Sequence, residues 1–196
     1  MTKPPFQADA SGQKDCTDVL NEAIRTAQRY HYVCYFPLGT YKVSDTLQGQ
    51  QYIWWDQYPY DEYRIVQRSY PVVLMGERKR DGKGKLQRPT IYLSPYSEGF
   101  TFRDHHKEVI HIYNGACPEE NAAPASIENM ITGLNIKIGE GNIGAVGVSF
   151  YAAQGCSMED CVIDVGDGYC GLWGAAGNGG SHAQNVICGG RVGVDL

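Results

Sequence analysis

The first clear hydrophobic pattern along the chain is helical and lies near the N-terminus. Apolar residues recur there at the i, i+3 and i+4 spacing that places them on one helix face: Val19, Leu20, Ala23, Ile24 and Ala27. Thr17 stands at the position of an N-cap, and Asp18 adds a negative charge in the first turn. The pattern predicts an amphipathic helix over residues 17–28.

Beyond this helix the pattern changes to short β-rich runs separated by turns. Strands are predicted at residues 32–36, 41–43, 72–76 and 90–93. Two stretches show no clear period, and we expect them to form long excursion loops: residues 48–68 and 102–125. Loops of this kind often carry binding residues.

The last third of the chain contains a repeat. Residues 134–144 align without a gap with residues 161–171, at a constant offset of 27 residues. A third copy begins at Asn185, with Gly171 and Gly193 now 22 residues apart because the turn between the strands is shorter. Short strands and Gly-rich turns that repeat without a helix are typical of a β-solenoid, whose coils stack at about 4.8 Å.

A stack of coils exposes backbone groups and core at its ends, so it needs a capping element. The helix at residues 17–28 is the natural candidate for one end. At the other end the sequence stops at Leu196, in the middle of a repeat. We therefore expect residues 1–196 to form one β-helix domain that is the N-terminal part of a longer protein, or that an oligomeric partner completes.

Composition and charge limit which ligands and which cellular environment are expected for this chain. The 196 residues carry a net charge of -5, which argues against nucleic acid as a ligand. No apolar run approaches the ~20 residues of a membrane span, and the N-terminus shows no signal-peptide core, so a secretion signal would lie outside this chain. The seven cysteines form no CxxC pair and are odd in number, which predicts buried thiols with at most one or two disulfides.

The residues around the predicted helix resemble a known family. Asp15-Cys16-Thr17-Asp18 opens the helix, and Tyr35-Phe36-Pro37-Leu38-Gly39-Thr40-Tyr41 follows it. This combination resembles the opening of pectate-lyase-superfamily domains, which also occurs in rhamnogalacturonase-like and epimerase-like proteins and in β-1,3-glucanases built from two β-helices. The resemblance implies an all-β, right-handed parallel β-helix, a polysaccharide ligand, and an extracellular or periplasmic location.

The resemblance is less informative about chemistry, because the superfamily includes hydrolases, lyases, epimerases and phage tailspikes. One departure is visible: the family's usual Gly-Asp-Gly before the helix is replaced here by Ser11-Gly12-Gln13-Lys14-Asp15. In the β-1,3-glucanase relatives the catalytic acid lies well downstream of this region. The resemblance thus allows the catalytic residues to lie beyond Leu196.

Several familiar motifs can be set aside. Two GxGxxG segments begin at Gly139 and Gly166, but neither opens a helix as a dinucleotide site requires, so both are predicted to be coil turns. The run 76–85 lacks the spacing of a phosphate-binding loop. His105, His106 and His111 have no Cys or carboxylate that completes a recognised metal spacing, so no metal site is predicted.

The repeat places two carboxylates at equivalent positions of neighbouring coils. Glu140 aligns with Asp167, which predicts side chains roughly 5 Å apart on one face. Retaining glycosidases use two carboxyl groups at about this separation, one as acid and one as nucleophile. Such a pair could instead hold a Ca²⁺ ion that bridges an acidic sugar, or consist of solvated turn residues.

Aromatic and polar residues supply candidate substrate contacts. Trp173, His182 and Asn178 lie in or beside a Gly-rich segment, where an indole could stack on a sugar ring and His182 could transfer a proton. Trp54 and Trp55, with Tyr58 and Tyr60, form a second aromatic cluster. Packing against the solenoid remains the alternative for each of them.

The sequence thus predicts a carbohydrate-active protein, and two functions remain open. The first is glycoside hydrolysis at Glu140 and Asp167, which we favour over a lyase because the repeats contain few Lys or Arg residues. The second is a non-catalytic polysaccharide-binding or tailspike-like module in which aromatic residues make the contacts.

Overall fold

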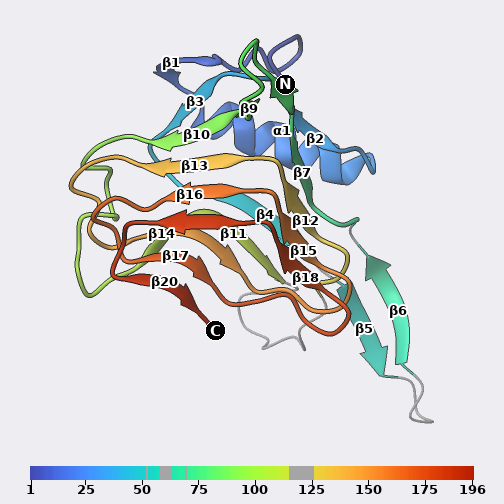
Figure 1. The fold of residues 1–196 in the computed structure, drawn as a ribbon. Helices are drawn as coiled ribbons and strands as arrows, with labels where there is room; N and C mark the ends of the chain where they lie inside the picture. Colours follow the sequence, from blue (N-terminus) through green and yellow to red (C-terminus); the bar gives the residue numbers. More distant parts are fainter. Residues whose placement is uncertain (52, 58–62, 69, 115–125) are drawn as a thin grey trace.

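The chain winds into a stack of coils with one helix at its N-terminal end (Figure 1). The computed structural model describes residues 1–51, 53–57, 63–68, 70–114 and 126–196, with side chains described in 1–51, 70–113 and 126–196. Three parallel sheets form the sides of the stack, and each coil contributes one strand to each of them. The predicted parallel β-helix is confirmed.

The three sheets contain 16 strands whose pairings are all parallel. Sheet A has the order β1 (Ser11–Asp15), β3 (Thr40–Val43), β10 (Thr90–Leu93), β13 (Asn135–Ile138), β16 (Val162–Asp164) and β19 (Val186–Cys188). Sheet B has the order β2 (Cys34–Phe36), β7 (Val73–Gly76), β12 (Met130–Thr132), β15 (Ser157–Glu159) and β18 (Ser181–Ala183). Sheet C has the order β4 (Leu47–Gln51), β11 (Lys107–Asn114), β14 (Ala145–Phe150), β17 (Cys170–Trp173) and β20 (Val192–Asp195).

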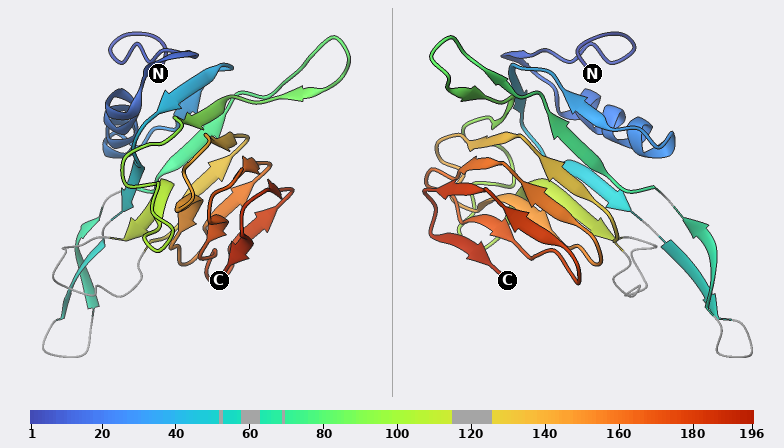
Figure 2. Two further views of the ribbon diagram at one scale, coloured as in Figure 1. Left: turned by 90° about the vertical axis from the view of Figure 1, so that its left-hand side faces the viewer. Right: turned by 45° about the vertical axis from the view of Figure 1, so that its right-hand side comes forward.

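Along the chain the sheets follow one another as B, A, C, and two antiparallel hairpins are inserted into this order. The first, β5 (Ile53–Gln57) with β6 (Tyr63–Arg68), lies between a strand of sheet C and the next strand of sheet B. The second, β8 (Lys79–Arg80) with β9 (Leu86–Gln87), lies between sheets B and A. Both hairpins extend away from the coil stack (Figure 2).

The sequence repeat corresponds to neighbouring coils, with one correction. Ile136 pairs with Ile163 and Ile131 with Met158, which confirms the 27-residue offset in sheets A and B. In sheet C, however, Val146 pairs with Cys170, because the turn before β17 is shorter than the turn before β14. The ungapped alignment therefore fails after this turn.

Apolar residues from successive coils form continuous rows inside the stack, because inward positions repeat in register. In sheet A, one row consists of five paired residues: Tyr41, Ile91, Ile136, Ile163 and Ile187. The first four of these are fully buried or nearly so, and Ile187 is partly buried. Each side chain thus packs between its counterparts in the coils above and below, which is how a β-solenoid buries a core without a second layer.

The helix α1 (Thr17–Arg29) covers the N-terminal end of the stack and contacts β2 and β4. Its apolar face buries Leu20, Ala23 and Ile24, as the spacing predicted. Thr17 is the first helical residue rather than the N-cap, which is Cys16. Instead, the Asp15 carboxylate accepts a hydrogen bond from the Thr17 N–H at 2.7 Å.

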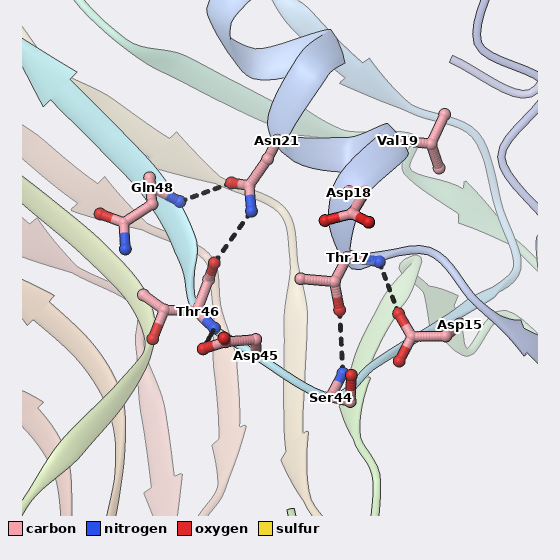
Figure 3. Close-up of a pocket in the computed structure, with 9 residues that line it drawn as sticks. All are labelled: Asp15, Thr17, Asp18, Val19, Asn21, Ser44, Asp45, Thr46 and Gln48. Carbon is pink, nitrogen blue, oxygen red and sulfur yellow. Dashed lines mark hydrogen bonds between the residues drawn. The ribbon is translucent and has the colours of Figure 1, made fainter. Parts of the chain in front are cut away.

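Polar side chains fasten the start of α1 to the segment between β3 and β4, around a hollow of about 550 Å³ (Figure 3). Ser44 N–H donates to the Thr17 hydroxyl at 2.9 Å, and the Asn21 amide donates to the Thr46 carbonyl at 3.0 Å. Burial raises the pKa of Asp15, but hydrogen bonds from Ser44 and Thr17 outweigh it and lower that pKa overall. These groups serve to hold the helix in place.

The two expected excursion loops are only partly loops. Residues 48–68 contain most of β4 and the strands β5 and β6, and residues 102–125 contain β11, which pairs with β14 and β4 in sheet C. The expectation was wrong at β11 because its apolar residues, Ile110 and Ile112, alternate with His111 and Tyr113 over only a few positions. About four alternating positions are the shortest run that indicates a strand, so this signal is easily missed.

The cysteines of the described residues are free thiols. Five are buried, namely Cys16, Cys34, Cys156, Cys161 and Cys170, and Cys188 is exposed. Burial raises the pKa of the Cys34 thiol to about 12 and that of Cys161 to about 11, so both are protonated at neutral pH. None of the helical residues that the structure describes forms a stretch long and apolar enough to cross a membrane.

Candidate functional site

The outer face of sheet C carries a row of residues with polar or aromatic side chains. Register places five residues side by side across the coils: Gln48, His111, Ser149, Trp173 and Asp195. Their neighbours one position earlier, such as Ile110 and Leu172, point into the core. Because side chains alternate along a strand, the row faces outward.

Six rings on and beside this face form an unbroken series of contacts, which we call the aromatic band. In order they are Tyr113, His111, Tyr151, Trp173, His106 and Tyr169. Successive ring centroids lie 4.3, 6.4, 6.1, 6.0 and 3.6 Å apart. Tyr113 and His111 lie on β11 and Trp173 lies on β17, whereas Tyr151 directly follows β14, and His106 and Tyr169 directly precede β11 and β17.

The side chains of the band present both aromatic ring faces and polar hydroxyl or ring-nitrogen groups. Tyr151 is 50% exposed, and the rings of Trp173 and His106 are partly exposed. Burial lowers the pKa of His111, with the charge of Glu108 opposing this effect, so its ring is uncharged at neutral pH. A surface of partly exposed aromatic rings with polar tips is suited to an amphipathic ligand such as a sugar ring.

One carboxylate lies at the end of the band near β20. The Tyr169 hydroxyl donates a hydrogen bond to Asp195 Oδ2 at 3.1 Å, and this bond raises the pKa of Tyr169. The Arg191 guanidinium lies 5.0 Å from the centroid of the Tyr169 ring. Asp195 and Arg191 thus add one negative and one positive charge beside the rings.

Ser149 is the one member of the row without any exposure. It is fully buried between His111 and Trp173 on the neighbouring strands, and its hydroxyl has no hydrogen-bond partner within the described residues. An unsatisfied buried hydroxyl costs free energy.

The two predicted catalytic carboxylates lie together on the turns that lead from sheet A to sheet C. Both Glu140 and Asp167 are exposed. Asp167 Oδ2 accepts a hydrogen bond at 3.2 Å from the N–H of Gly141, the residue after Glu140, and the Tyr96 hydroxyl donates to Glu140 Oε1 at 3.2 Å. The structure thus brings the pair to adjacent turns, and within the described residues no third metal-ligating side chain joins them.

The three predicted substrate contacts near the Gly-rich segment have different environments. Trp173 lies at the end of β17 within the aromatic band, and Asn178 is exposed in a turn. His182 instead extends the inward row of Leu74, Ile131 and Met158 in sheet B. Its Nε2 accepts a hydrogen bond from the Ala176 N–H at 2.8 Å, and burial lowers its pKa, so this position does not favour substrate contact.

The second predicted aromatic cluster is described only in its backbone. Trp54 and Trp55 lie in β5 and pair with Gln67 and Ile65 of β6. Their side chains, and all of Tyr58 and Tyr60, lie outside the described residues. Their proposed contact with substrate therefore stays a prediction.

Most of the aromatic band was not predicted from the sequence. His106, His111, Tyr113, Tyr151 and Tyr169 come from distant positions, and only the coil register brings them together. The alternation in Ile110-His111-Ile112-Tyr113 was the available signal, since it would have placed both rings on the outer face of a strand.

Comparison with known proteins identifies the family. No individual curated protein matches the chain. A family model described as "Rhamnogalacturonase A/epimerase, pectate lyase-like" matches residues 5–196, which is nearly the whole chain. This match agrees with the parallel β-helix and with the opening segment around α1. The chain belongs to the rhamnogalacturonase A/epimerase, pectate lyase-like family.

Proposed function

We propose that the protein binds an extracellular polysaccharide along the outer face of sheet C, with the aromatic band as the contact surface. The single observation that carries this proposal is the unbroken series of six rings on β11 and β17 and on the residues next to β11, β14 and β17. A polysaccharide is a repeating, elongated ligand, so it can stack sugar rings on several of these side chains at once. The family match supports a carbohydrate ligand.

Replacing Trp173 with alanine is expected to weaken polysaccharide binding about tenfold, which corresponds to about 1.4 kcal/mol. Trp173 contacts both Tyr151 and His106, so its loss interrupts the band at its centre. Affinity electrophoresis against a panel of neutral and acidic polysaccharides measures the effect. Tyr151→Ala, at a half-exposed ring, is expected to act in the same direction with less effect on folding.

Tyr30→Ala is the matched control, because Tyr30 is 60% exposed at the end of α1 and outside the band. Unchanged binding in this variant would show that the effect belongs to the band and not to any exposed ring. Full affinity in both Trp173→Ala and Tyr151→Ala would contradict the proposal.

We further propose glycoside hydrolysis with Glu140 and Asp167 as the carboxyl pair. The hydrogen bond from Gly141 to Asp167, which holds the two turns together, favours this candidate. One carboxyl would protonate the leaving oxygen, and the other would attack the anomeric carbon as nucleophile or stabilise the charge that develops there.

Glu140→Gln and Asp167→Asn are each expected to lower the rate of hydrolysis by about a hundredfold or more while sparing binding. New reducing ends measure hydrolysis, and absorbance at 235 nm would reveal β-elimination instead. Asp104→Asn, at an exposed carboxylate outside the pair, serves as control. Reducing ends formed at the wild-type rate by both variants would rule out the pair as catalytic residues.

A further inference from the structure

The hairpin of β8 and β9 concentrates positive charge on a chain that is acidic overall. Residues 78–88 hold six of the 17 Lys and Arg residues and one of the 22 acidic residues, whereas the net charge of the chain is -5. The hairpin extends well beyond the coil stack in both views of Figure 2. This charge therefore lies on a projecting element.

Hydrogen bonds within the hairpin stabilise its tip. Asp81 Oδ1 accepts from the N–H groups of Lys83 and Lys85, each at 2.9 Å. The Arg80 guanidinium donates to the Gly84 carbonyl at 2.7 Å. A Cβ added at Gly82 or Gly84 would meet no described atom within 4 Å, so the tip stands clear of the rest of the described chain.

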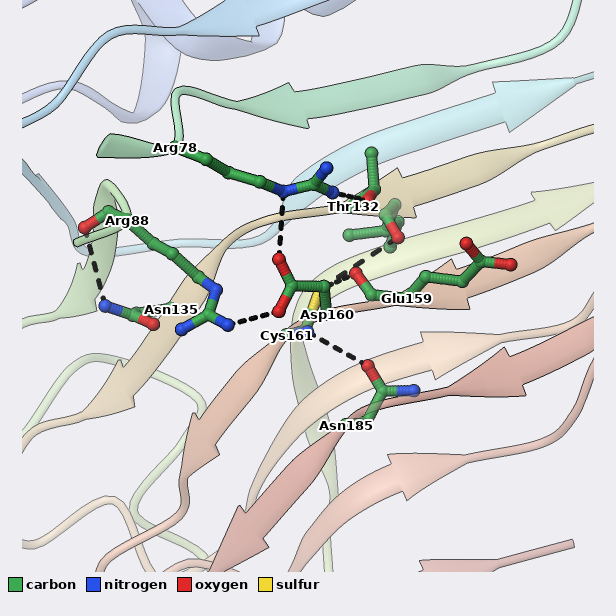
Figure 4. Close-up of polar contacts among 9 residues, drawn as sticks. Arg78, Arg88, Thr132, Asn135, Glu159, Asp160, Cys161 and Asn185 are labelled. Carbon is green, nitrogen blue, oxygen red and sulfur yellow. Dashed lines mark hydrogen bonds and ion pairs between the residues drawn. The ribbon is translucent and has the colours of Figure 1, made fainter. Parts of the chain in front are cut away.

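The base of the hairpin is fixed to the coil stack by one carboxylate (Figure 4). Arg78 precedes β8, and its Nε lies 2.9 Å from Asp160 Oδ2. Arg88 follows β9 and binds the other oxygen of Asp160, while Arg78 also donates to the Thr132 hydroxyl. Because Arg78 and Arg88 flank the hairpin and both bind the Asp160 side chain, they attach the hairpin to the turn between β15 and β16.

Three lysines of the hairpin do not help to stabilise it through their charged groups. Lys79, Lys83 and Lys85 are exposed, and within the described residues their ammonium groups have no hydrogen bond or ion pair. We propose that the β8–β9 hairpin is a cationic arm on which these three lysines bind a linear polysaccharide that carries carboxylate groups. This contact is separate from the aromatic band and does not depend on it.

A carboxylated polysaccharide fits this arm better than nucleic acid does. The cations are confined to one narrow hairpin, so a duplex wide enough to cover it would also meet a chain whose other residues are predominantly acidic. A single flexible polymer can contact the arm alone. Lysines supply mobile point charges that suit carboxylates spaced along such a polymer.

The test compares two triple variants with the same change in net charge. One combines Lys79→Gln, Lys83→Gln and Lys85→Gln, and the control combines Lys3→Gln, Lys14→Gln and Lys137→Gln at exposed positions elsewhere. Binding of polygalacturonate at low ionic strength is expected to weaken about tenfold in the first variant, with a shallower salt dependence. The control is expected to stay within about twofold of the wild type.

Equal losses in the two triple variants, or no loss in the first, would overturn the proposal. Wild-type binding to double-stranded DNA as tight as to polygalacturonate would overturn the choice of polysaccharide as partner. Binding of a neutral glucan distinguishes the two contact surfaces. Because this polymer has no carboxylates, its binding is expected to depend on the aromatic band and not on the three lysines. Lysine-dependent polygalacturonate binding with no effect of Trp173→Ala on any polysaccharide would support the arm and contradict the function proposed for the band.

Discussion

Replacing Ile136 with alanine is expected to lower the free energy of unfolding by about 3–4 kcal/mol. Ile136 is fully buried at the centre of the sheet A row, between Ile91 and Ile163 on the neighbouring coils. Truncation removes contacts in both directions along the stack and leaves a cavity that strands on either side cannot close. Denaturant unfolding monitored by circular dichroism measures the change.

Two further substitutions control this result. Ile136→Val keeps most of the volume and is expected to cost about 1 kcal/mol. Lys137→Ala, at the exposed position next along the same strand, is expected to change stability by less than about 0.5 kcal/mol. If alanine at 136 cost no more than valine, the row would not be the continuous core described above.

Replacing Asp160 with asparagine is expected to destabilise the protein by about 2–3 kcal/mol. Asp160 is 18% exposed in its side chain and accepts from both Arg78 and Arg88, of which Arg88 is 15% exposed (Figure 4). Asparagine keeps the size of the side chain and tolerates the positive φ of 53° at this position, so the substitution removes chiefly the charge. Two guanidinium groups then lose their partner at a half-buried site.

Asp164→Asn is the matched control, because it makes the same chemical change on the adjacent strand at a partly exposed position. Thermal unfolding of the two variants side by side separates the local effect from the change in net charge. Equal melting temperatures would show that Asp160 does not anchor the hairpin, contrary to the geometry of its contacts.

The sequence was sufficient to predict the parts of the fold in which one period is repeated. The helix at 17–28 was predicted within one residue of its observed bounds, Thr17–Arg29, since its apolar face follows one clear spacing. The strand at 90–93 matches β10, and the 27-residue offset matches the pairing of β13 with β16. Inward apolar positions repeat in the sequence because they repeat in space.

Turns and outer faces were harder to predict. The alignment failed before β17 because turn length is free to vary while strand register is not. His182 was expected near the substrate, but its place in an inward row is visible only once β18 is paired with β15. The aromatic band was missed for the same reason, since register in sheet C joins residues that the sequence keeps far apart.

The row across sheet C runs perpendicular to the path of the chain, and each coil supplies one member of it. Gain or loss of one whole coil would therefore lengthen or shorten the row by a single position and leave the other members unchanged. A one-residue insertion within a strand would instead turn alternate side chains to the opposite face. A binding surface on this fold can therefore become longer or shorter by whole coils, while the core of the remaining coils stays the same.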